Sequence, residues 1–164
     1  MNNLIYANSK VKYYEKTLLT DSFLYTLAKT VNYEDAVNQL IGSRYIPAEY
    51  KDKSIDEISK FKEEELTKKM KDLKADLPPF NESTHELRTW YSLINKLKSN
   101  NKKEENKKIE FLKTKKADVF GLYPIFAYHY AFLSEIRNIR IILTGKRLGV
   151  PYKDIEERLC ITYV

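Results

Sequence analysis

The sequence of 164 residues predicts a single all-α domain, a bundle of about six to seven helices. Glycine and proline are scarce, with 4 and 5 residues, whereas the helix formers Lys, Glu and Leu are abundant. Side chains that cap helix N-termini recur along the chain. Apolar residues also repeat at intervals of three and four in the longest apolar stretch. We expect the N-terminal and C-terminal helices to pack together.

The first fifty residues predict three helices in quick succession. Apolar side chains at helical spacing indicate a helix over residues 4–19. Asp21 or Ser22 can cap a second, short helix. Asn32 can cap a third, after which Gly42 can take the left-handed conformation that often ends a helix. The first of these helices is long enough to pack against another long one.

The middle of the chain predicts two charged helices that open with the same signal. Residues 54–57 and 83–86 both carry Ser in the first position and Glu in the fourth, the pattern of a capping box. The first helix can run to about residue 77, where Pro78 follows. Residues 106–116 are either helical or a mobile connection.

The longest helix is predicted near the C-terminus. Pro124 suits its first turn, basic residues at Lys146 and Arg147 suit its last, and Gly149 and Pro151 form a stop before a short final helix. Its apolar stripe has helical spacing and consists of Ile125, Tyr128, Phe132, Ile136, Ile139 and Leu143. Further apolar residues widen this surface, so we expect the helix at the centre of the bundle. Polar residues interrupt it, which argues against a transmembrane span.

The net charge of +6 is concentrated in residues 96–116, which carry nine lysines and three glutamates. Such a segment could contact nucleic acid or an anionic membrane surface. Phe111 is its only aromatic residue and the glutamates dilute its field, so a solvated surface is favoured.

Motifs of catalytic or metal-binding proteins are missing from the sequence. It contains no glycine-rich phosphate loop and no His-Glu-x-x-His, and its two histidines, His85 and His129, lie far apart. Cys160 is the single cysteine, which suits a reducing cytoplasm. We therefore expect no catalytic residue, cofactor or metal. The thirteen tyrosines favour a binding protein over an enzyme.

Charged residues inside the longest helix raise the question of their partners. Glu135, Arg137 and Arg140 lie within two turns, and Glu135 cannot pair with both arginines. If buried, the arginines need acidic partners on packed helices, such as Glu15 or Glu34. Alternatively, they face another protein of an assembly.

The C-terminal part of the chain carries a distinctive series of motifs. Residues 134–146 read Ser-Glu-Ile-Arg-Asn-Ile-Arg-Ile-Ile-Leu-Thr-Gly-Lys, residues 148–151 read Leu-Gly-Val-Pro, and Glu-Arg-Leu at 157–159 precedes the final Tyr-Val. This series resembles the C-type subunits of V-type and A-type ATPases (ATP synthases), which are called d-type subunits in eukaryotes. Near the N-terminus, Tyr-Ala-Asn-Ser-Lys-Val-Lys at 6–12 and residues 35–45 are also similar to the family.

The resemblance covers residues 1–50 and 117–164 and leaves residues 51–116 as a charged helical insert or hairpin in the single domain 1–164. Members of this family are usually longer, with three similar helical domains, so we expect an internally shortened member. The resemblance implies a non-catalytic connector in the central stalk of a rotary ATPase. Its partners would be central-stalk subunits and the membrane rotor ring, and its place would be the cytoplasmic face, in contact with the membrane only through the ring.

Structural or partner contacts are expected at seven positions of the family-like segments: Lys10, Lys12, Tyr45, Glu135, Arg137, Arg140 and Lys146. Two other functions remain as alternatives. One is a stand-alone helical adaptor with the same termini. The other is a basic nucleic-acid-binding protein, whose affinity for nucleic acid would fall with salt and depend on Lys102, Lys103, Lys107 and Lys108. This alternative is less favoured, and we expect no nucleic acid as a partner.

Overall fold

A computed structural model of the chain describes residues 2–76, residue 92 and residues 101–164. These residues form seven α-helices, one short 3-10 helix and no strand, which confirms the predicted all-α fold. The helix predicted to start at Ser83 lies outside the described residues. Among the helices that are described, none is long and apolar enough to cross a bilayer.

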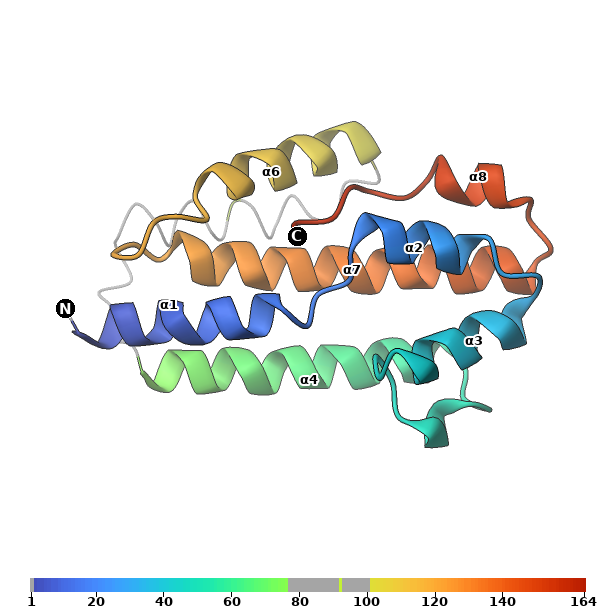
Figure 1. The fold of residues 1–164 in the computed structure, drawn as a ribbon, viewed down its shortest axis with the longest axis horizontal. Helices are drawn as coiled ribbons and strands as arrows, with labels where there is room; N and C mark the ends of the chain where they lie inside the picture. Colours follow the sequence, from blue (N-terminus) through green and yellow to red (C-terminus); the bar gives the residue numbers. More distant parts are fainter. Residues whose placement is uncertain (1, 77–91, 93–100) are drawn as a thin grey trace.

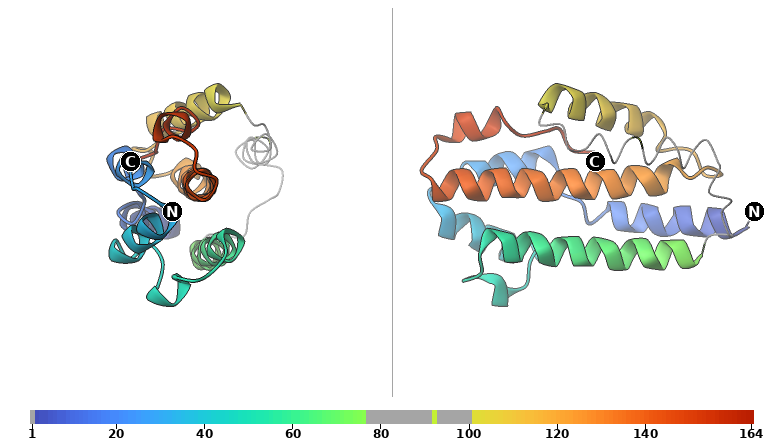
Figure 2. Two further views of the ribbon diagram at one scale, coloured as in Figure 1. Left: turned by 90° about the vertical axis from the view of Figure 1, so that its right-hand side faces the viewer. Right: turned by 180° about the vertical axis from the view of Figure 1, so that it is seen from behind.

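The long helices lie side by side, with one of them at the centre (Figure 1). In chain order the elements are α1 (Asn2–Glu15), α2 (Asp21–Ala28), α3 (Tyr33–Gly42), η1 (Ala48–Tyr50), α4 (Ile55–Ala75), α6 (Lys102–Thr114), α7 (Tyr123–Arg147) and α8 (Tyr152–Glu156). Helix α7 contacts α1, α2, α3, α4, α6 and α8. The two views of Figure 2 show α4 on one side of α7, and α6 and α8 on the other. The predicted packing of the N-terminal and C-terminal helices is therefore confirmed.

The predicted apolar stripe of α7 is buried along its whole length and joins two hydrophobic clusters. The first half of α7 packs with apolar residues of α1, α4 and α6, and the second half with those of α2, α3 and α8. Burial of this much apolar surface on one helix is the main source of stability for the bundle.

The start of the chain differs from the prediction in two places. Helix α1 ends at Glu15 rather than near residue 19. The N-cap of α2 is Thr20, whose hydroxyl accepts a hydrogen bond from the Phe23 amide at 3.2 Å. Asp21 was the wrong choice of cap because its carboxylate accepts a hydrogen bond from the Thr162 amide at 2.8 Å instead. The tertiary contact outcompetes the local one.

The turn after α3 also departs from the prediction. Asn32 caps this helix as expected, but Gly42 is its last helical residue. The left-handed conformation falls on Arg44, with φ 61°. The Tyr45 amide donates to the Leu40 carbonyl at 3.0 Å, and this tight return of the chain requires one left-handed residue just before Tyr45.

The remaining helix signals are confirmed in the described residues. Ser54 and Glu57 form a complete capping box at the start of α4. Residues 106–116 were predicted to be either helical or a mobile connection. They are helical as far as Thr114, the last residue of α6, whose N-cap is Asn101. Gly149, with φ 68°, forms the expected stop after α7.

Candidate functional site

The candidate functional site is the set of polar residues that the central helix carries in the Glu-Ile-Arg-Asn-Ile-Arg motif at 135–140 and at Lys146. These residues lie inside or at the edge of an otherwise apolar interface. Each of them reaches a different neighbouring element. The site is therefore a group of polar links between α7 and the elements around it.

Asn138 links α7 to the C-terminal segment. Its side chain is 1% exposed, and its amide pairs twice with the backbone of Cys160: Nδ2 donates to the carbonyl at 2.9 Å, and Oδ1 accepts from the amide at 3.0 Å. Asn138 is absent from the predicted contact residues. An uncharged amide in the middle of an apolar helix was the available signal, because such a group is buried only when it is hydrogen-bonded.

Replacing Asn138 with alanine should destabilise the protein by about 2 kcal/mol, because the buried amide and carbonyl of Cys160 would both lose their partner. Urea denaturation followed by circular dichroism would measure this loss. Asn38→Ala is the matched control, since Asn38 lies exposed in α3 and the same substitution removes no buried group there. Equal stabilities of the two variants would contradict the structural role of Asn138.

Glu135 is buried between α7, the connection from α1 to α2, and α4. It is 4% exposed, and its Oε2 accepts a hydrogen bond from the Leu19 amide. Its Oε1 has no hydrogen-bond partner among the described residues. Burial raises the pKa of the Glu135 carboxyl to about 7, although the Leu19 amide and the charge of Lys62 oppose this rise. Glu135 therefore changes charge close to neutral pH.

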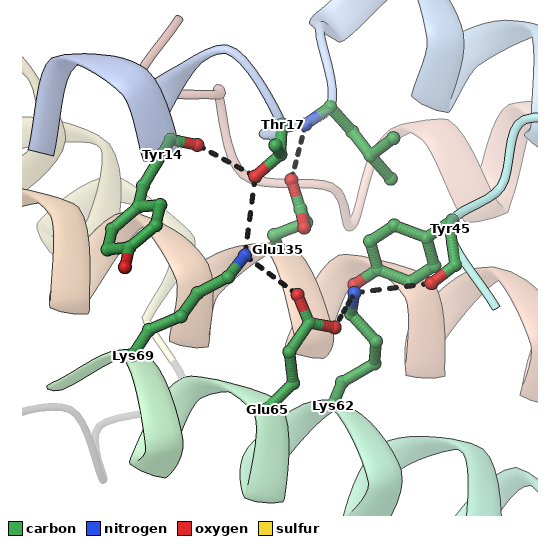
Figure 3. A network of polar contacts seen from close by, with 8 residues as sticks. Tyr14, Thr17, Tyr45, Lys62, Glu65, Lys69 and Glu135 are labelled. Atoms are coloured by element: carbon green, nitrogen blue, oxygen red, sulfur yellow. Dashed lines mark hydrogen bonds and ion pairs between the residues drawn. The ribbon is translucent and has the colours of Figure 1, made fainter. Parts of the chain in front are cut away.

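A second polar group, contributed by α4, lies beside Glu135 (Figure 3). Glu65 pairs with two lysines, with Lys62 at 2.6 Å and with Lys69 at 2.7 Å. The Lys62 ammonium also donates to the Tyr45 carbonyl at 3.2 Å and lies 3.9 Å from the centre of the Tyr45 ring. Burial lowers the pKa of Lys62. The predicted residues Glu135 and Tyr45 thus lie in one region, where Lys62 bonds the Tyr45 carbonyl and acts on Glu135 through its charge.

The two arginines of the motif pair with acidic residues, as the first of the two alternatives predicted. Their partners are different from those named. Arg137 lies 3.9 Å from Glu105 of α6, and Arg140 lies 2.7 Å from Asp56 of α4. Glu15 and Glu34 were wrong because they pair with other cations, Glu15 with Lys12 and Glu34 with Lys51. Glu105 is 1% exposed and also accepts a hydrogen bond from the Tyr130 hydroxyl.

The three predicted lysines also have partners within the chain. The Lys146 ammonium donates to the Thr30 carbonyl, between α2 and α3, and burial lowers its pKa. Lys10 pairs with Asp76 at 2.6 Å and with Asp72 at 3.2 Å, and the hydrogen bond that it donates to Asp76 raises its pKa.

Lys12 reaches the connection between α6 and α7. Its ammonium donates to the Lys116 carbonyl at 2.7 Å and lies 3.4 Å from Glu15. With Lys12, all seven predicted contact residues have an internal contact. The structure brings Tyr45 and Glu135 together and distributes the other five residues over the length of the bundle.

The described residues contain no group of three His, Cys, Asp or Glu side chains that could hold a metal ion. His129 is partly buried, and burial lowers its pKa to about 4, so it is neutral at physiological pH. Cys160 is buried, which raises its pKa. The contacts of the site residues hold α7 in position against the elements around it.

The protein is thus an all-α bundle in which the motif residues of one central helix contact the elements around it. The family model of the ATP synthase (C/AC39) subunit matches residues 82–158. The match covers α6, α7 and α8, and it confirms the family that the sequence resembles. Over this segment the chain is similar to that family, which supports a role as one subunit of a V/A-type ATPase.

The match also begins earlier in the chain than the family-like segment recognised from its motifs. It starts at residue 82, inside the segment expected to be an insert, and ends at Arg158. No curated protein and no solved structure matches this chain.

Proposed function

We propose that this chain is a non-catalytic connector in the central stalk of a rotary V/A-type ATPase. It would lie on the cytoplasmic face of the membrane, between the stalk of the head that hydrolyses or synthesises ATP and the ring that moves ions. The match to the ATP synthase (C/AC39) subunit supports the complex, and the way in which α7 is held supports the connector role.

The observation that carries this proposal is the number of separate elements tied to one rigid helix. Polar links join α7 to Leu19 before α2, to Asp56 in α4, to Glu105 in α6 and to Cys160 in the C-terminal segment. A connector that transmits torque must resist deformation, because a soft element stores the applied work as strain. Close packing combined with the buried hydrogen bonds of Glu135 and Asn138 gives such resistance, and the ion pairs of Arg137 and Arg140 add contacts nearer the surface.

Purification of the tagged full chain from its native membranes in mild detergent tests the proposal. We expect central-stalk and ring subunits to be recovered with it. A connector on the rotation axis can be present only once, so quantitative mass spectrometry should give one copy of this chain for each central stalk. The untagged strain is the control for nonspecific recovery.

Two outcomes would overturn the connector role. Recovery of the chain without stalk or ring subunits would identify a stand-alone helical adaptor. Recovery with the complex at many copies for each stalk would place the chain away from the rotation axis.

A further inference from the structure

A cleft of about 720 Å³ opens beside the Glu135 network, on the side away from the arginines of the motif. It lies between the end of α1, the turn that follows α3, and α4. Its volume falls within the usual range for small-molecule sites. Neither the family resemblance nor the connector role accounts for this cleft.

Positive charge dominates the polar part of the cleft wall. Its lining contains a single carboxylate, that of Glu65. It contains four cationic side chains: Lys16, Arg44, Lys62 and Lys69. Lys62 and Lys69 share Glu65 at the base. Figure 3 shows both lysines directed at that carboxylate, with Lys69 also reaching Thr17 and Lys62 also reaching Tyr45. Since one carboxylate faces four cations, the cleft keeps an excess of positive charge.

The two cations at the rim are available to a ligand. Lys16 and Arg44 are exposed, and neither makes a hydrogen bond or an ion pair with another described residue through its side chain. Arg44 holds its position at φ 61°, a left-handed conformation that an arginine rarely adopts. A glycine would fit this turn with less strain, so the guanidinium is placed at the rim at a cost in backbone energy. Such strain is typical of functional positions.

The rest of the cleft wall is apolar. Leu19, Ile41 and Phe61 are partly buried and line the cleft together with the buried Ile46. An inorganic ion would leave this apolar surface in contact with water. A ligand with both an anionic group and an apolar body would cover it.

We propose that this cleft binds a small organic phosphate, with the phosphate group held by Lys16, Arg44 and Lys69 and an apolar or aromatic body against Phe61 and Ile41. Arginine and lysine are the side chains that recognise phosphate oxygens. The proposal is independent of the connector role, since the cleft lies within this chain and requires no other protein.

Titration of the full chain with phenyl phosphate, followed by ¹H–¹⁵N NMR at constant ionic strength, tests the site. We expect saturable shifts of the amides of residues 16–19 and 43–46, which border the cleft. Inorganic phosphate should shift the same amides with a weaker affinity, because it lacks the apolar body. Stronger binding of inorganic phosphate than of phenyl phosphate would overturn the role of the apolar wall.

Two variants separate binding from folding. Arg44→Gly removes the guanidinium and relieves the left-handed strain, so the melting temperature should stay the same or rise while the affinity falls about fivefold or more. Lys16→Gln should weaken binding by a similar factor. Lys153→Gln, an exposed substitution in α8, is the control and should leave the affinity unchanged.

Three results would contradict the proposal. Shifts that do not saturate, or that occur away from the cleft, would show that no phosphate site exists here. Unchanged affinity in both rim variants would remove the assigned ligand groups. Saturation by a glutamate-rich peptide, with no response to phenyl phosphate, would assign the cleft to a protein partner.

Discussion

Phe132→Ala should lower the free energy of unfolding by about 3–5 kcal/mol, a substantial part of the stability of a domain of this size. Phe132 is 1% exposed at the middle of α7. The ammonium groups of Lys62 and Lys69 lie 5.1 and 5.2 Å from its ring centre, and the Tyr128 ring packs edge-on against it. The substitution would leave a cavity and remove the aromatic face that the two lysines contact.

Chemical denaturation monitored by circular dichroism would measure this loss. Phe132→Leu keeps most of the apolar volume and should cost about 1–2 kcal/mol, which separates the aromatic contribution from the loss of volume. Phe111→Ala is the control for loss of a phenyl ring at an exposed position, since Phe111 is 43% exposed. A similar loss in Phe111→Ala and Phe132→Ala would contradict the central position of Phe132.

Glu135→Gln should change how stability depends on pH. The pKa of Glu135 is about 7 in the folded protein, above its ordinary value of 4.5, so between these values the folded state binds the proton that the unfolded state has lost. The contribution of protonated Glu135 is therefore complete below about pH 4.5 and is lost as the pH rises through 7. The loss amounts to about 3 kcal/mol at most.

The measurement is the difference in free energy of unfolding between Glu135→Gln and the wild type from pH 4.5 to pH 8. We expect this difference to shift in favour of the variant as the pH rises, because glutamine avoids the buried charge. His129 contributes a slope of opposite sign, since burial lowers its pKa, and taking the difference removes that contribution.

Glu57→Gln is the matched control for this measurement. Hydrogen bonds with Ser54 lower the pKa of Glu57, so its contribution is present at neutral pH and is lost only as the pH falls below its ordinary value. The difference between Glu57→Gln and the wild type should therefore stay constant above pH 5. A constant difference for Glu135→Gln over the same range would contradict the burial of its carboxyl.

Most of the described fold could be predicted because its signals are local. The Asn32 cap, the capping box at Ser54 and the stop at Gly149 depend on residues within one turn of each other. The failures occurred where a distant group competed with a local one. Asp21 bonds the Thr162 amide, so the cap of α2 passes to Thr20.

The candidate site was predicted in its location but only partly in its contacts. The spacing of Glu135, Arg137 and Arg140 on one helix showed that they could not all satisfy one another. The identity of their partners depends on which face of α7 each neighbouring helix covers. Glu105 and Asp56 reach the arginines because α6 and α4 pack on those faces.

The sequence by itself determined that the chain is helical, that α7 is its apolar centre, and that its C-terminal motif is similar to the ATP synthase (C/AC39) subunit family. The tertiary structure alone decided that Asn138 holds Cys160, that Glu135 is buried with a raised pKa, and that four cations line one cleft. The physical reason is the distance along the sequence over which each interaction acts. Helix periodicity and capping act over a few neighbouring residues, whereas burial and ion pairing depend on groups that only the packed bundle brings together.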